Sequence, residues 1–274
     1  MDENFNQKRV NHIFHYTKSL ESLIGIIRGG FFPSYCKERI AETEYFIPMV
    51  SFCNISIRDV SSYMRYGDYG IGLSIEWAIK NRISPAIYFH ENSPFNDLHR
   101  SINKVLLEDM AGKLVSDVLS NMFEAASRGE KYEHDPSKDE PYTKVLTAVN
   151  QITVPALQYF KSWKVKYKDH EIITYQEREW RFVPELPPGM RLISSTDEEY
   201  ESYQKGEKSK PHLPDKPLEI QTISDIRYII IKNENERKET LDRLVDRFGK
   251  EALFNALYGC SLLILTDNQV KNDF

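Results

Sequence analysis

Two glutamates separated by one residue, Glu177 and Glu179, form the acidic pair that stands out in this sequence. On a β-strand, alternate side chains project from the same face, so these two would lie about 6 to 7 Å apart, with Arg178 on the opposite face. Two like charges at this distance raise the proton affinity of one of them, or bind a cationic or hydroxyl-rich ligand. The alternative is a solvated edge strand that carries mixed charges.

A histidine and two tyrosines could contact a ligand of this acidic pair. His15 lies in an apolar segment directly before a predicted helix, where its imidazole could hydrogen-bond ligand hydroxyls or serve as a satisfied core histidine. Tyr66 and Tyr69 stand beside glycines in the run YGDYGIGLS, so an aromatic ring could face a flat ligand ring while the backbone approaches closely. The alternative for both tyrosines is packing within a turn.

A basic stretch with interleaved aromatic residues, KSWKVKYK, follows later in the chain. It contains Lys161, Trp163, Lys164, Lys166, Tyr167 and Lys168. Such a stretch could bind the phosphates of RNA and stack its bases, or it could be the solvated end of a basic helix. The sequence contains no P-loop, no His-Glu-x-x-His zinc motif and no Gly-x-Ser-x-Gly elbow. No metal site is expected.

Hydrophobic spacing predicts the elements that position these residues. Short apolar runs predict strands at residues 13–16, 49–53, 86–89, 171–185, 226–231 and 261–265. Helical spacing predicts helices at residues 20–28, 74–82, 98–127, 145–152 and 241–248, with Thr17 or Ser19 capping the first and Ser74 the second. We therefore expect a single α+β domain over residues 1–274, with a helical insertion at about 96–168 and a mobile surface loop at about 187–217.

The composition narrows the class of protein. With 274 residues, 41% of them hydrophobic and 28% charged, the chain is neither disordered nor a coiled coil. A net charge of −5 argues against coating of nucleic acid through bulk charge, although a local basic groove stays open. Three scattered cysteines and the absence of a signal peptide or membrane segment predict a reduced, cytoplasmic protein without a membrane partner.

The order of these motifs resembles that of ADP-ribosyltransferase-like proteins. The run His15-Tyr16-Thr17 before a helix is similar to their His-x-Thr, and YGIGLS is similar to their glycine-containing strand and serine-capped helix. Glu177-x-Glu179 resembles their catalytic Glu-x-Glu, whereas Ser51-Phe52-Cys53 departs from their Ser-Thr-Ser pattern. More specifically, VSFCNISIRDVSSYMRYGDYGIGLSIEWAIKN and YQEREWRFVPE resemble the bacterial abortive-infection family AbiGi, whose members are described as phage-resistance proteins or antitoxins.

This resemblance implies an ADP-ribosyltransferase-like split β-sandwich with a helical insertion, which binds NAD as a substrate in a cleft and needs no metal. It implies that Glu179 stabilises the ribosyl cation, that Glu177 orients or deprotonates the nucleophile, and that His15 contacts the nicotinamide ribose. Tyr69, beside the glycine strand, is our choice over Tyr66 for stacking on nicotinamide. The implied NAD-binding residues are His15, Tyr16, Thr17, Ser51, Tyr66, Tyr69 and Gly70.

Three functions remain in competition. The first is an NAD-dependent ADP-ribosyltransferase that acts as the toxic effector of a bacterial anti-phage system of the abortive-infection or toxin–antitoxin type. Its acceptor would be an RNA or a protein, and its partner a cognate antitoxin. The second is a non-catalytic antitoxin or binding protein on the same scaffold, which holds a cognate toxin. The third is a metal-free nuclease built on His15 and the acidic pair. We favour the enzyme that uses NAD.

Overall fold

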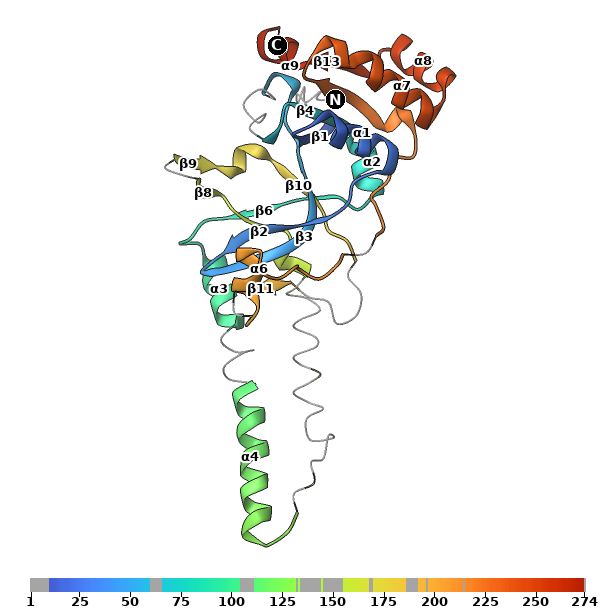
Figure 1. Cartoon of the computed structure of the whole chain (residues 1–274). Coiled ribbons are helices and arrows are strands. Elements are labelled where there is room, and N and C mark those ends of the chain that lie inside the picture. The colour runs from blue at the N-terminus through green and yellow to red at the C-terminus, as the bar shows by residue number, and fades with distance from the viewer. Residues whose placement is uncertain are drawn as a thin grey trace, which may run out of the picture.

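The computed structural model describes residues 10–59, 66–103, 111–131, 133, 144, 155–167, 170–185, 192–195, 197–213 and 215–273. Within this part of the chain, nine strands form the main sheet, in the order β13-β12-β4-β1-β3-β10-β5, with β2 and β11 also paired to β3. Their bounds are β1 (His12–Thr17), β2 (Ser34–Ile40), β3 (Thr43–Cys53), β4 (Tyr69–Ser74), β5 (Ser84–Pro85), β10 (Glu179–Phe182), β11 (Ile193–Ser194), β12 (Ile226–Ile231) and β13 (Leu263–Thr266). Figure 1 shows these strands in the body of the molecule.

Two pairs of short strands lie outside the main sheet. Strand β6 (Ile87–Phe89) pairs in parallel with β7 (Phe160–Ser162), and β8 (Lys164–Tyr167) pairs antiparallel with β9 (His170–Ile173). Three short 3-10 helices are η4 (Thr174–Glu177), η5 (Ile223–Asp225) and η6 (Glu234–Glu236).

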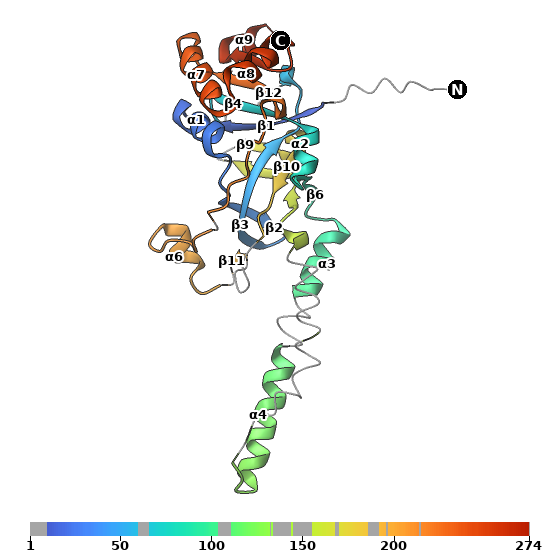
Figure 2. The same ribbon diagram turned by 90° about the vertical axis from the view of Figure 1, so that its right-hand side faces the viewer.

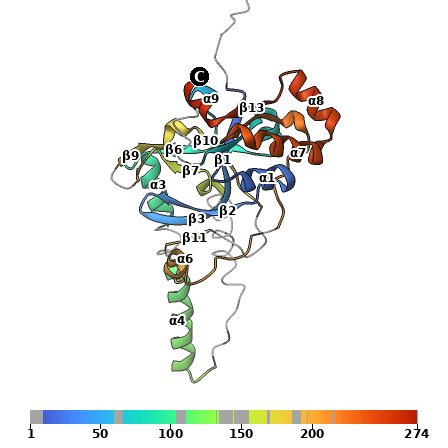
Figure 3. The same cartoon turned by 45° about the horizontal axis from the view of Figure 1, so that its top comes forward.

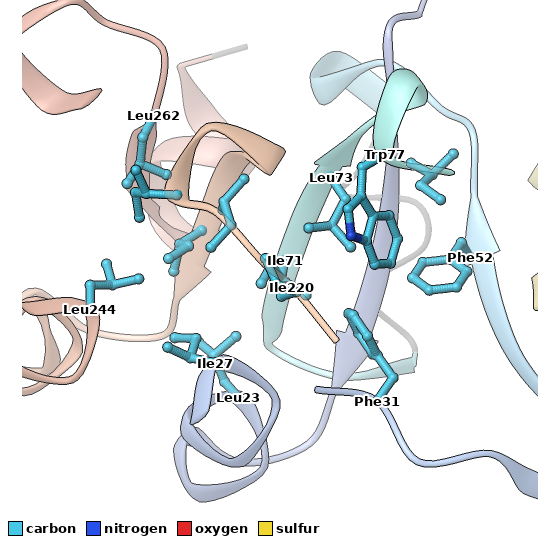
Figure 4. Packing of buried hydrophobic residues seen from close by; sticks show 14 of the residues in the cluster. Leu23, Ile27, Phe31, Phe52, Ile71, Leu73, Trp77, Ile220, Leu244 and Leu262 are labelled. Atoms are coloured by element: carbon cyan, nitrogen blue, oxygen red, sulfur yellow. The ribbon is translucent and has the colours of Figure 1, made fainter. Parts of the chain in front are cut away.

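Helices cover one face of the sheet around β1, β4 and β12. They are α1 (Leu20–Gly29), α2 (Ile75–Lys80), α7 (Arg237–Phe248) and α8 (Lys250–Tyr258), and α1 packs beside α7 (Figure 3). Their apolar residues, among them Leu23, Trp77 and Leu244, enclose Ile71 and Leu73 of β4 in the largest core cluster (Figure 4). The predicted caps are confirmed, because the side chains of Ser19 and Ser74 accept backbone hydrogen bonds at the starts of α1 and α2.

The opposite face of the sheet carries Glu179, whereas the alternation along β1 places His15 on the helix-covered side, against Phe31 and Phe52. Strand β3 pairs with β1 only at Phe14 and Cys53, whereas β1 pairs with β4 along its whole length. Beyond that single pair, β1 and β3 separate. Glu179 of β10 pairs with Cys53 on the other edge of β3, so Phe14, Cys53 and Glu179 lie side by side on one face.

Within the predicted helical insertion, the described residues form helices at its beginning and strands at its end. Helices α3 (Pro94–Asn103) and α4 (Ala111–Ser127) form there, and α4 projects from the body of the molecule (Figures 1 and 2). The predicted helix at 145–152 lies outside the described residues. From Phe160 onward the chain forms β7 and β8, because the alternating side chains of this stretch suit pairing with β6 and β9.

The predicted loop at 187–217 also contains regular structure. Strand β11 pairs with Tyr45 and Phe46 of β3, and α6 (Tyr200–Lys205) buries Tyr200 and Tyr203 against Phe46. Helix α9 (Asp267–Asn272) follows β13 and buries Val270. Among the described helices, none is long and apolar enough to cross a bilayer.

The end of α1 depends on a glycine. Gly30 has φ 82° and ψ −169°, a conformation open essentially only to glycine, and a Cβ there would lie 2.5 Å from the carbonyl oxygen of Leu218. We expect Gly30→Ala to lower the free energy of unfolding by about 2 kcal/mol or more, measured by urea denaturation.

Gly25, in the exposed middle of the same helix, is the matched control. A Cβ at Gly25 meets no atom within 4 Å, so Gly25→Ala should raise the stability by about 0.5 to 1 kcal/mol. Equal effects of the two substitutions would contradict the role assigned to Gly30.

Candidate functional site

A cavity of about 210 Å³ opens where β1 and β3 separate. It brings together six residues that the sequence predicted as site residues, from four different elements and a segment before β4. These are His15, Tyr16, Ser51, Tyr66, Glu177 and Glu179. Three further lining residues with ionisable side chains, Glu38, Cys53 and Lys161, complete its polar wall.

The acidic pair is arranged differently from the prediction. Glu177 ends the 3-10 helix η4, Arg178 has a left-handed backbone with φ 44°, and Glu179 begins β10. The prediction of one continuous strand was therefore wrong. The turn leaves Arg178 exposed, while Glu177 and Glu179 are 3% and 4% exposed. The turn is held by Asn54, whose N–H donates to the carbonyl of Arg178 (3.1 Å).

Arg181 anchors the carboxylate of Glu179. Its side chain is 0% exposed, and its Nε donates to Oε1 of Glu179 at 2.6 Å. Its Nη2 donates to Glu38 at 2.6 Å, and its Nη1 donates to the carbonyls of Gln158 (2.8 Å) and Phe160 (3.2 Å). All three guanidinium nitrogens are therefore engaged, and the orientation of Arg181 is fixed by both carboxylates and backbone.

Lys161 lies between the two carboxylates of the pair. Its Nζ is 3.3 Å from Oε2 of Glu177 and also donates to Oε2 of Glu179. The alternative of a solvated basic helix end is thus wrong for this residue, because Lys161 stands on β7 with a side chain that is 12% exposed. Tyr66 donates to Oε1 of Glu177 at 2.5 Å, and Ser51 donates to Oε1 of Glu179 at 3.2 Å.

Three acids and two bases of this cluster share one buried environment. Burial favours the neutral form of Glu179, but Arg181 and Lys161 outweigh it and hold the pKa of Glu179 below its usual value. Burial, joined by the repulsion of Glu179 and Glu177, raises the pKa of Glu38 against the attraction of the same two cations. For Lys161, the attraction of Glu179, Glu38 and Glu177 exceeds the effect of burial and raises its pKa. Glu179 and Lys161 are accordingly both charged at neutral pH.

His15 closes the cavity at the separation of β1 and β3. Its Nδ1 is 2.9 Å from the carbonyl oxygen of Ser51, so Nδ1 carries the proton and Nε2 is the acceptor of the neutral ring. The ring packs edge-on against Phe31 and Phe52. Burial lowers the pKa of His15, and the Ser51 carbonyl opposes this only in part.

Three residues predicted to bind NAD do not line the cavity. Tyr69 is buried in the helix-covered core, and its hydroxyl donates to Glu236 at 2.9 Å. Burial, together with this carboxylate, raises the pKa of Tyr69 to about 12. Thr17 pairs with Tyr69 at the far end of β1, and Gly70 gives room to Tyr16, whose ring would lie 3.2 Å from an added Cβ. The structure thus separates Tyr69 from the acidic pair and brings Tyr66 to it.

A second cavity of about 790 Å³ adjoins the first. The two share Glu38, Tyr66, Lys161 and Glu177 in their walls. Lys164 and Lys166 line the larger cavity, and Lys164 pairs with Glu171 at 2.6 Å. Lys168 of the predicted basic stretch lies outside the described residues.

The sequence analysis missed Arg181, Glu38 and Tyr88 as parts of this site. Tyr88 of β6 accepts a hydrogen bond from the N–H of Glu179 at 2.7 Å. Arg181 had a local signal, because the alternation of EWRF places it on the same face as Glu179. Glu38 and Tyr88 had none, since each reaches the cluster from a strand distant in sequence. Among the described residues, no group of three histidine, cysteine or acidic side chains could hold a metal ion.

Comparison with known proteins finds one family of matches. A family model described as "Putative abortive phage resistance protein AbiGi, antitoxin" matches residues 31–232, a range that includes Ser51, Glu177 and Glu179. "Abortive phage resistance protein AbiGi" of Lactococcus lactis subsp. cremoris is 27% identical over 264 residues, which cover 87% of this chain and 93% of that protein. No solved structure matches the chain.

Loss of Arg181 should destabilise the protein strongly. Arg181→Met leaves Glu179 and Glu38 buried without their fixed cation, so we expect the free energy of unfolding to fall by about 3 to 5 kcal/mol in urea denaturation. In the control, Arg100→Met removes an ion pair with Glu42 whose side chains are 49% and 75% exposed, and the loss should stay below about 1 kcal/mol. A similar loss in both variants would disprove the anchoring role.

His15 should make the folded protein less stable at acid pH. Because its pKa is lowered in the folded state, the unfolded chain binds the proton more readily, and stability is lost as the pH falls below the ordinary histidine value of 6.5. Burial also lowers the pKa of His12 and His99, which act in the same direction. His15→Gln should reduce this slope by up to about 1.4 kcal/mol per pH unit, measured by urea unfolding at several pH values.

The exposed His90 serves as the matched control, and His90→Gln should leave the slope unchanged. An unchanged slope in His15→Gln as well would show that His15 does not titrate differently in the folded and unfolded states.

Proposed function

The chain belongs to the AbiGi family of abortive phage resistance proteins, and from this premise we propose that it acts in phage defence as an NAD-dependent ADP-ribosyltransferase. One observation carries the proposal. His15, Ser51, Tyr66, Glu177 and Glu179, far apart in sequence, line a single cavity at the separation of two strands. Such convergence of polar groups, two of which, His15 and Glu179, have shifted pKa values, is typical of a ligand site.

The dimensions of the two adjoining cavities suit a dinucleotide. Ligand pockets commonly measure about 300 to 1,000 Å³, and the smaller cavity alone, at about 210 Å³, would hold only one part of NAD. The larger cavity of about 790 Å³ shares its wall and offers room for the rest. We assign the nicotinamide ribose to the smaller cavity, beside Glu179, and the adenosine diphosphate to the larger one.

The chemistry required is the exchange of one bond at the ribose. The bond between C1′ and the nicotinamide nitrogen breaks, its electron pair leaves with nicotinamide, and positive charge develops on the ribose ring. The ionised Glu179 stabilises that charge, held in place by Arg181 and Ser51. An oxygen or nitrogen of the acceptor then bonds to C1′, and its proton passes to Glu177.

His15 and Tyr66 position the substrate in this scheme. The neutral imidazole of His15 presents Nε2 as an acceptor for a ribose hydroxyl, since its Nδ1–H is engaged by Ser51. Tyr66, which is 43% exposed and hydrogen-bonded to Glu177, replaces Tyr69 as the aromatic residue beside nicotinamide. The acceptor is an RNA or a protein, as the sequence analysis left open.

Glu179→Gln tests this function directly. The full-length protein is incubated with NAD labelled in the adenylate phosphate and an extract of phage-infected cells, and label transferred to macromolecules is measured. We expect the initial rate to fall at least about 100-fold, because the amide cannot stabilise a cation as a carboxylate does. Glu185→Gln, the same chemical change at a side chain that is 92% exposed, should keep the full rate. Equal rates in the two variants would exclude Glu179 as the catalytic residue.

The second candidate function is that of a non-catalytic antitoxin, which the family description itself names. Under this alternative the buried charge cluster is structural, and the protein acts by binding a cognate toxin through its surface. Expression separates the two functions, because an effector arrests growth when produced alone, whereas an antitoxin is harmless alone and relieves a toxic partner. Phage resistance that survives Glu179→Gln in a folded protein would favour the antitoxin.

A further inference from the structure

Lys161 occupies the junction of the two cavities. It is one of four residues that line both, together with Glu38, Tyr66 and Glu177, and it is the one cation among these four. A ligand that extends from the smaller cavity into the larger one must therefore pass its ammonium group. The two halves of a dinucleotide are linked by a pyrophosphate with two negative charges. In a dinucleotide that spans both cavities, this linkage would lie at the junction.

The hydrogen bonds of Lys161 leave it free to exchange partners. Among the described residues, two carboxylates, those of Glu177 and Glu179, accept from the three N–H groups of its ammonium. Arg181 differs in this respect, because its guanidinium is fully buried and held by two carboxylates and two backbone carbonyls. Lysine is a point charge on a flexible stem, whereas the planar guanidinium is fixed in orientation.

Both carboxylates keep a donor when Lys161 moves away. Glu177 retains the hydroxyl of Tyr66 at 2.5 Å, and Glu179 retains Nε of Arg181 at 2.6 Å and the hydroxyl of Ser51. The carboxylate of Glu179 would then face the cavity without a mobile cation between it and the ligand. The cost of removing Lys161 is therefore limited by groups that are already in place.

We propose that Lys161 is a phosphate-binding residue, which rests on Glu177 and Glu179 in the free protein and transfers to the pyrophosphate of a bound dinucleotide. This inference rests on the proposed function and adds a residue and a step to it. Seating of the phosphates draws the ammonium from Glu179, and so the carboxylate is exposed to the ribose only when the whole ligand is bound. The site would thereby discriminate against ligands that lack the pyrophosphate.

The test compares two probes, ADP-ribose, which carries the pyrophosphate, and nicotinamide riboside, which does not. Binding to the full-length protein is measured by isothermal titration calorimetry. We expect Lys161→Met to weaken the binding of ADP-ribose at least about 10-fold, since a charge-assisted contact to phosphate is lost. The affinity for nicotinamide riboside should change less than about 3-fold. Lys205→Met, the same change at a lysine that lines neither cavity and whose side chain is 59% exposed, should weaken ADP-ribose binding less than about 3-fold.

A second variant guards against loss of the fold. Lys161→Met leaves Glu177 and Glu179 with one cation fewer, so the double variant Lys161→Met/Glu177→Gln, which removes one charge of each sign, is measured beside it. Compared with the single variant Glu177→Gln, the double variant should bind ADP-ribose more weakly by the same factor and bind nicotinamide riboside about equally well. Circular dichroism confirms that each variant is folded before binding is compared.

The outcomes separate this inference from the function on which it rests. If ADP-ribose binds equally to the wild type and to folded Lys161 variants, or if Lys205→Met has the same effect as Lys161→Met, the inference is overturned while the nucleotide site stands. Equal weakening of both probes also overturns it, because it shows a general disturbance of the cavity. Failure of the wild type to bind either probe would refute the proposed function, and the inference with it.

Discussion

The ion pair between Arg181 and Glu179 is the interaction on which the candidate site depends. Both side chains are almost entirely buried, on one strand, two residues apart, and a charge in such a place is tolerated only when it is paired and hydrogen-bonded. Arg181 meets this condition with carboxylates on two sides and two backbone carbonyls on a third nitrogen. The carboxylate of Glu179 is consequently fixed in position and ionised.

The cluster has one acid more than it has bases, and this excess sets its electrostatic character. Glu38, Glu177 and Glu179 face Lys161 and Arg181, so one negative charge is not balanced within the cluster when all five groups are ionised. Burial raises the pKa of Glu38, so Glu38 takes up a proton more readily than Glu179, which stays ionised. A negatively charged cavity wall suits a ligand that develops positive charge, as the ribose of NAD does in the proposed reaction.

The two candidate functions place different demands on this cluster. A transferase needs Glu179 to face its substrate, which requires that the lysine between them can move. An antitoxin needs only that the fold be stable, and a buried network with a satisfied arginine supplies that without any ligand. Membership of the AbiGi family is compatible with both, because the family model carries the word antitoxin and the Lactococcus lactis relative is described by phage resistance alone.

The local elements were largely predictable from the sequence, since their causes are local. Caps at Ser19 and Ser74, the apolar run of β12 and the glycine after α7 all act through neighbouring residues, and each element formed where it was expected. The stretch that contains Lys161 was harder, because a short amphipathic segment becomes a strand only when a partner, here β6, is beside it.

The sequence by itself determined the residue types of the site and their chemistry: an imidazole, a pair of carboxylates and tyrosines next to glycine. Only the tertiary structure decided which of them meet. It brought Tyr66 and not Tyr69 to the acidic pair, turned the chain at Arg178, and set Lys161 and Glu38 beside Glu179. The reason is physical: a buried charge selects its partners by position in space, and residues over 100 positions apart, such as Glu38 and Arg181, leave no local trace of that choice.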